Sequence, residues 1–352
     1  MGENYQRLSL NDAYLNVAAT VNDWAKGFAS LSFGDPTTNA NPGAFNNLGV
    51  AEYSAAYANN INSSGSNIIQ LEQAYATLGN FDVTPFFLQV GKQFQDFGRY
   101  EIHPITRTMA QVLSETLATS IKVGFVAEGF SGAISAFDDP INKIGNASKP
   151  TNYVAALGYD MPNDQLGFDV GAAYIYNMIG ANDVAYSVAN FEGAGGTESF
   201  TGYQTRVGAY SLYGDVNYGP FTLGVRFVQA LQRFNVNDLP KDGAASLVGD
   251  NIIGEPLADA NGAKPWAVDA MAGYAFNIWD RSQNVHIGYQ TSREAAGIDL
   301  PKSRWLVGYD IEAVNNWIVG AEWDHDNAYN VANGGTGNNT NLVSIRSTIK
   351  FG

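Results

Sequence analysis

The sequence predicts an all-β protein, a transmembrane antiparallel β-barrel of about 16 strands, with roughly 14 to 18 allowed at about 20 residues per strand and connection. Segments of about ten residues alternate along the whole chain between apolar or aromatic residues and small or polar ones. Only 15% of the 352 residues are charged, although 45% are hydrophobic and 12% aromatic. No run approaches the roughly 18 apolar residues that a membrane-spanning helix needs.

The alternation is clearest in three segments. In 221–227 the odd positions are apolar and Arg226 falls on the other face, where a core strand would not bury it. The segments 304–312 and 317–324 also keep their charges on one face. Similar segments, which bring the number to about fifteen, cover 8–20, 24–33, 68–78, 83–93, 118–126, 131–138, 152–160, 166–177, 203–217, 266–276, 285–292 and 341–351.

The connections alternate between short and long, as in outer-membrane barrels with short periplasmic turns and long extracellular loops. Short turns are expected at 21–23, 79–81, 162–164, 217–220 and 314–316, and long loops rich in Gly, Asn and Asp at 34–67, 94–117, 139–151, 178–202, 232–265, 293–303 and 325–340. The tryptophans adjoin these turns and loops, as interfacial rings do. A soluble β-sandwich is the alternative, but its outer faces would carry many Lys and Glu.

The last strand ends in Phe351, a terminal aromatic of the kind found in bacterial outer-membrane barrels, so the long loops are expected outside the cell. Counting back, the first strand would run the same way as the last. An even barrel then needs one more strand, upstream of residue 1 or at 50–57, which also alternates. We expect residues 1–352 to form a single barrel domain without an N-terminal plug.

Composition excludes several classes of function. The net charge of −15 leaves no basic surface for nucleic acid. The chain has no Cys, which removes thiolate catalysis and zinc–thiolate sites. His103 has no matched Ser or Asp spacing, His286 alternates inward, and the run Asp324-His325-Asp326 is more readily a solvated loop than a metal site. We therefore expect no catalytic residues, no metal and no cofactor.

Residues 94–117 depart from the alternation and become helical in period. After Pro104 the apolar residues Ile105, Met109, Val112, Leu113 and Leu117 share one face, and Arg107, Gln111 and Glu115 form a polar stripe on the other. We expect this segment to fold into the lumen and show the stripe to solute. A helix over the rim, or a contact within an oligomer, is the alternative.

The candidate solute-contacting residues follow from that segment and from the alternation. Phe97, Arg99, Tyr100 and Arg107 rank highest, because aromatic and guanidinium groups suit a planar or carboxylate-rich ligand. The inward phase adds wall positions that form opposed basic and acidic rows. Each of them is more readily a solvated or salt-bridged wall charge than part of a filter: Lys122, Arg226, Arg304, Arg346 and Lys350 against Asp269, Asp310, Glu312, Glu322 and Asp324.

Several stretches resemble a known family. The opening LNDAYLNVAATVNDWAKGFASLSF, then LEQAYATLGN, the segment from VGKQFQDFGRYEIHPITRTMAQVLSETLATSIKVGF and the terminal IRSTIKF are similar to LbtU-type siderophore porins of Gram-negative outer membranes. The resemblance implies a plug-less outer-membrane channel that admits a ferric siderophore or related iron complex. The family supplies no fixed set of ligand residues to transfer.

A general diffusion porin for small hydrophilic solutes is the alternative function, since the same lumen would serve both. A purely structural or adhesive barrel is a third reading, which an occluded, non-conducting lumen would favour. The expected partners are the solute, outer-membrane lipid and lipopolysaccharide, and no nucleic acid. The sequence leaves the oligomeric state open.

Overall fold

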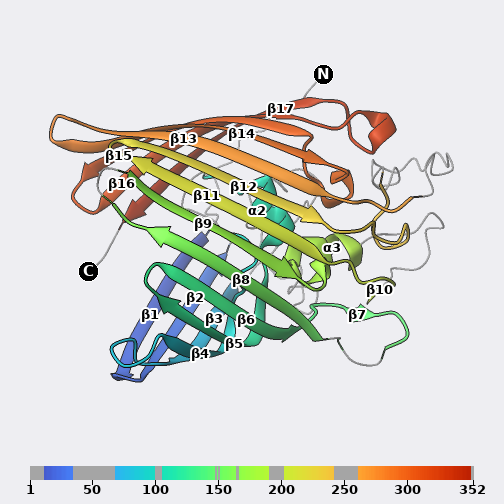
Figure 1. The fold of residues 1–352 in the computed structure, drawn as a ribbon. Helices are drawn as coiled ribbons and strands as arrows, with labels where there is room; N and C mark the ends of the chain where they lie inside the picture. The colour runs from blue at the N-terminus through green and yellow to red at the C-terminus, as the bar shows by residue number, and fades with distance from the viewer. Residues whose placement is uncertain are drawn as a thin grey trace.

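Fifteen strands form one antiparallel sheet that curves around a central space (Figure 1). The computed structural model describes residues 12–34, 68–99, 105–146, 149, 151–163, 166–189, 202–241 and 261–349. The first strands of the sheet are β1 (Asp12–Asn22), β2 (Ala25–Gly34), β3 (Ile68–Leu78), β4 (Phe86–Phe94), β5 (Leu117–Ala127), β6 (Phe130–Asp138) and β8 (Thr151–Met161). They continue with β9 (Leu166–Ile175), β11 (Ala209–Tyr218), β12 (Phe221–Ala230), β13 (Trp266–Ile278), β14 (Arg281–Arg293), β15 (Ser303–Val314), β16 (Trp317–Asn327) and β17 (Asn339–Ile349).

The order of strands in the sheet follows the chain, and each strand pairs with the next. This meander confirms the predicted all-β antiparallel architecture. The sheet is not closed, because within the described residues β1 and β17 form its two edges. With an odd number of antiparallel strands, β1 and β17 run in the same direction, as the sequence predicts. The segment 50–57 lies outside the described residues.

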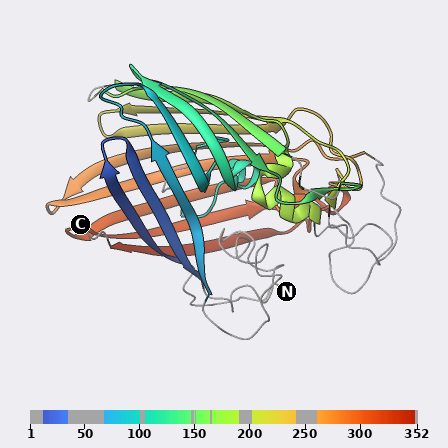
Figure 2. The ribbon, with the colours of Figure 1, turned by 90° about the horizontal axis from the view of Figure 1, so that it is seen from below.

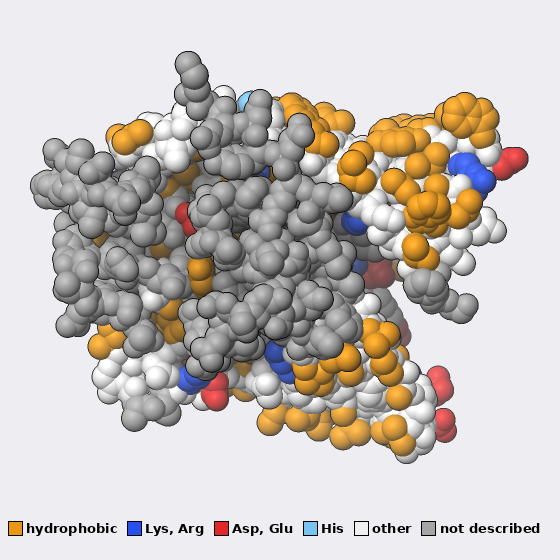
Figure 3. All heavy atoms as spheres, turned by 180° about the vertical axis from the view of Figure 1, so that it is seen from behind, with side chains coloured by type: hydrophobic (Ala, Val, Ile, Leu, Met, Phe, Trp, Pro, Cys, Tyr) orange, Lys and Arg blue, Asp and Glu red, His pale blue; other side chains and the backbone are white. Residues whose placement is uncertain are grey.

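The alternation of the sequence becomes an inner and an outer face. On β15, Trp305 and Val307 are exposed on the outside, whereas Arg304 and Asp310 are 2% and 5% exposed on the inside. Glu322 and Asp324 of β16 are likewise buried on the inside. An apolar exterior is what hydrocarbon requires of a spanning sheet. Apolar side chains cover much of the described outer surface in Figure 3, with charged side chains near the strand ends.

Short hairpin turns join the strands at one end of the sheet. The turn between β13 and β14 consists of Trp279 and Asp280, with φ of 58° and 56°. Two consecutive residues with positive φ make a type I′ turn, whose twist matches that of the flanking strands. These turns gather at the end of the sheet opposite α3 (Figure 2).

A packed layer lies at the other end, where the long connections are. It contains α2 (Met109–Ser114), α3 (Asn182–Ala189), the short pair β7 (Asn142–Lys143) and β10 (Gly202–Tyr203), and the 3₁₀ turns η3 (Met178–Gly180) and η4 (Ala296–Ile298). A further 3₁₀ turn, η5 (Val331–Asn333), is exposed between β16 and β17. The predicted segment 203–217 is therefore divided, because β10 pairs with β7 and only β11 joins the barrel sheet. Among the described residues, no helix has the length and apolar character needed to cross a membrane.

The apolar core of the protein lies in this layer. Met109 and Leu113 of α2 belong to the same buried cluster as Ile179 of η3 and Val184 of α3. Asp139, which follows β6 and is fully buried, links residues of β8, β10 and the end of β9. Its carboxylate accepts hydrogen bonds from Asn152 Nδ2 at 2.7 Å, Asn177 Nδ2 at 2.8 Å and the Tyr203 hydroxyl at 2.7 Å.

Candidate functional site

Residues 94–117 leave the wall of the sheet between β4 and β5. Their described parts, 94–99 and 105–117, lie on the inner side, where α2 contacts β12, β13 and β14 (Figures 1 and 2). The observed helix α2 is shorter than the helical face that the sequence predicts between Ile105 and Leu117. Thr108 caps α2 by accepting the Gln111 amide at 3.2 Å, Glu115 already has extended backbone, and Leu117 begins β5.

Carboxylates of the wall hold the chain just before α2. Glu322 of β16 accepts the amide of Ile105 at 2.8 Å through one oxygen and the amide of Thr106 at 2.8 Å through the other. The Thr106 hydroxyl donates to Asp324 at 2.6 Å. Hydrogen bonds to ionised groups are about twice as strong as neutral ones, so this part of the segment is fixed to β16.

The first turn of α2 is held in the same way. The Met109 amide donates to Gln290 Oε1 of β14 at 3.1 Å, and the Ala110 amide donates to Asp269 Oδ2 of β13 at 2.9 Å. These amides have no partner within the helix, because the first turn precedes the i−4 pattern. The wall side chains therefore complete the hydrogen bonding of the helix.

Arg107 is enclosed by acidic side chains. It pairs with Asp183 of α3 and lies 3.3 Å from Glu115. Its carbonyl accepts a hydrogen bond from Arg304 Nη1 at 3.1 Å. Glu115 also accepts a hydrogen bond from Gln111 Nε2. The predicted polar stripe is thus largely bonded to itself and to α3, and Gln111 is the member that lines the neighbouring cavity.

A row of three carboxylates crosses the inner face of the opposite part of the sheet. Asp160 of β8 is directly opposite Asp169 of β9, which is directly opposite Asp215 of β11. Like charges in this position repel each other. Two guanidinium groups offset the repulsion: Arg99 pairs with Asp169, and Arg226 binds Asp215 through two hydrogen bonds of 2.8 and 2.9 Å.

An aromatic ring lies beside this row. The guanidinium carbon of Arg99 is 5.2 Å from the ring centre of Tyr213, and that of Arg226 is 5.8 Å away. The ring has room because Gly171 faces it; a Cβ there would lie 2.4 Å from a ring carbon. Arg99 therefore joins segment 94–117 to β9 and β11, while Ile105, Thr106 and Ala110 join it to β13 and β16.

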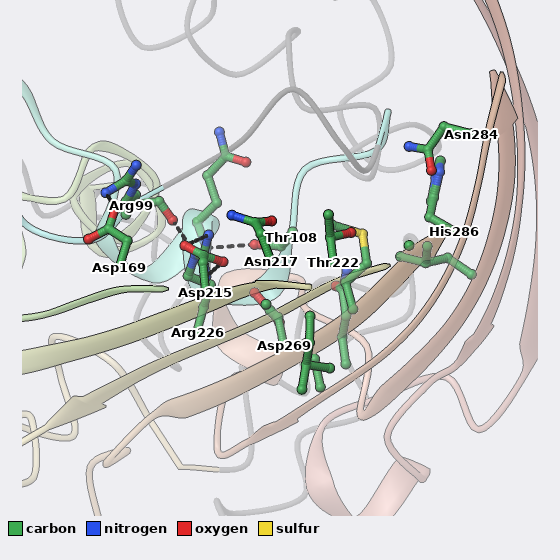
Figure 4. Close-up of a pocket in the computed structure, with 18 of the residues that line it drawn as sticks. Arg99, Thr108, Asp169, Asp215, Asn217, Thr222, Arg226, Asp269, Asn284 and His286 are labelled. Carbon is green, nitrogen blue, oxygen red and sulfur yellow. Dashed lines mark hydrogen bonds and ion pairs between the residues drawn. The ribbon is translucent and has the colours of Figure 1, made fainter. Parts of the chain in front are cut away.

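These groups border a cavity of about 450 Å³ on the inner side of the sheet (Figure 4). Its charged lining consists of Arg99, Arg226, Asp160, Asp169, Asp215 and Asp269, with His286 on its far side. The volume lies within the range of about 300–1,000 Å³ usual for small-molecule sites. The cavity can hold a small polar solute.

The other predicted residues have varied environments. Phe97 is fully buried in the apolar cluster, so it packs the segment and does not line the cavity. Lys122 pairs with Asp96, Arg304 with Asp326 and Arg346 with Asp310. The basic and acidic side chains are thus paired along the wall, because residues on nearby strands are closer than residues across the lumen; Arg346 of β17 reaches Asp310 of β15 across Gly320 of β16. Tyr100 and Lys350 lie outside the described residues.

Two histidines, His286 and His325, lie in the described part of the chain. His286 Nε2 lies 3.2 Å from Glu322, and Nδ1 lies 3.7 Å from Asp310. His325 contacts Asn341 on the outer side, whereas Asp324 and Asp326 are buried inside. Within the described residues, no group of three or more His, Asp and Glu side chains is arranged to hold a metal ion.

Sequence reasoning missed Asp160, Asp169, Asp215 and Tyr213. The alternation contains a signal for them, because Asp169 and Gly171 share the inward phase of 166–177 and Asp215 shares that of 203–217. Their grouping depends on strand register, which the periodicity of one strand does not define.

The sheet, its apolar exterior and the segment across its inner side define a porin-like outer-membrane channel fold. The chain is similar to OmpF of Salmonella typhi, in a complex with daunomycin, with 12% identity, a TM-score of 0.56 and coverage of 96% of this chain and 89% of the other. It is also similar to the outer-membrane channel DcaP of Acinetobacter baumannii, with 10% identity, a TM-score of 0.53 and coverage of 97% and 84%.

The chain belongs to the family described as "Protein of unknown function (DUF3573)", whose profile matches residues 18–201. It is 23% identical to the UPF0422 protein lpl2888 of Legionella pneumophila strain Lens, over 98% of this chain and 62% of the relative. The UPF0422 protein of Coxiella burnetii is also 23% identical, over 93% and 61%. The chain thus spans about six tenths of the length of these relatives. A narrower assignment to LbtU-type siderophore porins is not established by these matches.

Proposed function

We propose that the chain is a single barrel in the bacterial outer membrane, in contact with lipid and lipopolysaccharide, that admits small hydrophilic solutes through a lumen narrowed by residues 94–117. The attachment of that segment to two parts of the inner wall carries the proposal. Barrels of about 16 strands leave an aqueous lumen unless loops fold inward. A segment held by charged wall groups would set the width of the passage.

The finer proposal is that the solute is a ferric siderophore or related iron complex. It is supported by the resemblance of 90–125 to siderophore porins and by a cavity of about 450 Å³ with both charged and aromatic walls. General diffusion of small solutes is equally compatible with the same lumen. Arg99, Arg107, Gln111 and Arg226 remain proposed contributors to the passage, and the role proposed is transport and not catalysis.

Two measurements test these proposals in turn. Protein folded into liposomes should let sugars of increasing size enter, seen as swelling, up to a limit set by the constriction. Liposomes that remain impermeable to the smallest sugar would contradict the channel. A strain that lacks the protein should then take up less iron from a supplied ferric siderophore and show normal uptake of an unrelated small solute. Equal loss of both would favour general diffusion.

A further inference from the structure

The cavity beside segment 94–117 has an excess of negative charge. Four carboxylates line it, those of Asp160, Asp169, Asp215 and Asp269, against the two guanidiniums of Arg99 and Arg226. A narrow lumen with low-dielectric walls concentrates the field of such charges and raises the local concentration of counter-ions.

Three basic side chains elsewhere on the described inner side do not offset this excess. Lys122 is bonded to Asp96 and to the carbonyl of Phe94. Arg304 makes two hydrogen bonds with Asp326, and Arg107 lies between Asp183 and Glu115. Each of these cations already has a carboxylate partner and offers little attraction to an anionic solute.

The row Asp160–Asp169–Asp215 already binds a cation within the molecule. The guanidinium of Arg99 pairs with Asp169 and lies over the Tyr213 ring, a combination that suits guanidinium and ammonium groups. The Arg99 side chain is 43% exposed, so this arrangement is reached by solvent. Asp160, the next carboxylate in the row, is exposed to the cavity.

A further acidic side chain, Asp269 of β13, lies at this cavity. Asp269 is 5% exposed, and its Oδ2 accepts the Ala110 amide, while its Oδ1 has no hydrogen-bond partner among the described residues. Asp269 lines the cavity (Figure 4). Its carboxylate therefore adds negative charge at the wall of the cavity.

We infer that this cavity selects cationic solutes, those with ammonium or guanidinium groups, over anions of similar size. The inference rests on the proposed channel function and narrows its solute class. An iron complex that passes this cavity readily would carry neutral or positive charge, and not the negative charge of a free polycarboxylate.

The test is the zero-current potential of single channels in a planar bilayer with a KCl gradient. Wild-type protein should show a potassium-to-chloride permeability ratio above one. D160N/D269N should lower the ratio by about twofold or more, the order expected for charges a few ångströms from the ion path in a partly aqueous lumen. Asn at 269 keeps an oxygen for the Ala110 amide, and D160N alone changes only an exposed side chain.

Two further variants test whether the permeability ratio changes in the expected direction and whether only charges in the cavity affect it. R99A removes a positive charge from the cavity and should raise the ratio, opposite to D160N/D269N. D23N, in the exposed turn after β1, removes the same charge outside the cavity and should leave the ratio unchanged. Heat-modifiable migration on gels verifies that each variant is folded.

The outcomes separate the inference from the function on which it rests. A conducting wild-type channel with a ratio at or below one would overturn the inference and leave the channel intact. Equal ratios for wild type, D160N/D269N and R99A would also overturn it, because selectivity would not arise at this cavity. Folded wild-type protein that does not conduct would overturn both.

Discussion

Glu322 binds the backbone of Thr106 across the inside of the sheet, with its Oε1 2.8 Å from the amide nitrogen. The two residues are 216 positions apart in the chain. Glu322 also accepts the amide of Ile105, so one buried carboxylate fixes two consecutive peptide units. The path of segment 94–117 is therefore determined by wall residues as well as by the sequence of the segment itself.

E322Q should loosen the segment. Gln is neutral and retains one acceptor oxygen, so one of the two hydrogen bonds is lost and the other is no longer charge-assisted; a hydrogen bond to a charged group is worth about 1.5–3 kcal/mol. We expect larger and noisier single-channel currents than in wild type. E128Q, in the turn between β5 and β6, is the matched control. Currents identical to wild type in E322Q would mean that Glu322 does not restrain the segment.

Gly171 should not tolerate a larger residue. A Cβ there would lie 2.4 Å from the Tyr213 ring, so G171V should displace the ring and the Arg99 guanidinium above it. We expect a lower yield of folded protein and altered conductance. G214V is the control, since a Cβ at Gly214 meets no atom closer than 3.8 Å. Equal folding yields for the two variants would contradict the observed packing.

A charged residue on the outer face of the sheet should lower the stability of the folded protein. Val307 is 48% exposed in the middle of β15. V307R should destabilise vesicle-folded protein by about 2–4 kcal/mol if the residue is near the centre of the bilayer. Denaturant unfolding in lipid vesicles measures this change. N315R, in the turn that follows β15, should have little effect, and a similar loss in both variants would argue against a lipid-facing position for Val307.

The layer at the loop end should become less stable as pH rises. Burial raises the pKa of the Asp139 carboxyl above its ordinary value, although the hydrogen bonds from Tyr203, Asn177 and Asn152 oppose the shift. A raised folded-state pKa means that the folded protein binds the proton more tightly than the unfolded chain. The stabilisation from that proton is complete below the unfolded pKa and is lost as pH rises through the folded pKa.

Hydrogen-exchange protection factors near Tyr203 should therefore fall as pH rises above about 4, the ordinary pKa of an Asp carboxyl. Burial also raises the pKa of Asp238, which contributes with the same sign. D139N should reduce the pH dependence without removing it. Protection that increases over this range in wild type would show that other groups dominate the layer.

The sequence predicts the faces of strands well because a period of two is local information. Arg226, Arg304, Glu322 and Asp324 all lie on the predicted inner side. The pairing of these charges is different, because Arg304 meets Asp326 only through the register of β15 with β16. Periodicity within one strand does not define that register.

The inward segment shows a second limit of sequence reasoning. Its apolar residues were expected to form one face of a longer helix, yet only Met109–Ser114 is helical. The Thr108 side chain caps the N-terminus of the helix by accepting the Gln111 amide. Leu117 belongs to β5, because it pairs with Phe94 of β4. Phe97 is buried by contacts with parts of the chain distant in sequence, so its aromatic character alone did not predict its role.

In the proposed function, residues 94–117 narrow an open channel. The most direct test is the single-channel conductance of wild type and of a variant in which 105–114 is replaced by a short Gly/Ser linker. Both are measured in planar bilayers after gels show them folded. We expect a higher conductance for the variant, because the segment held by Glu322, Asp324 and Asp269 is removed. Equal conductance of the two proteins would contradict it.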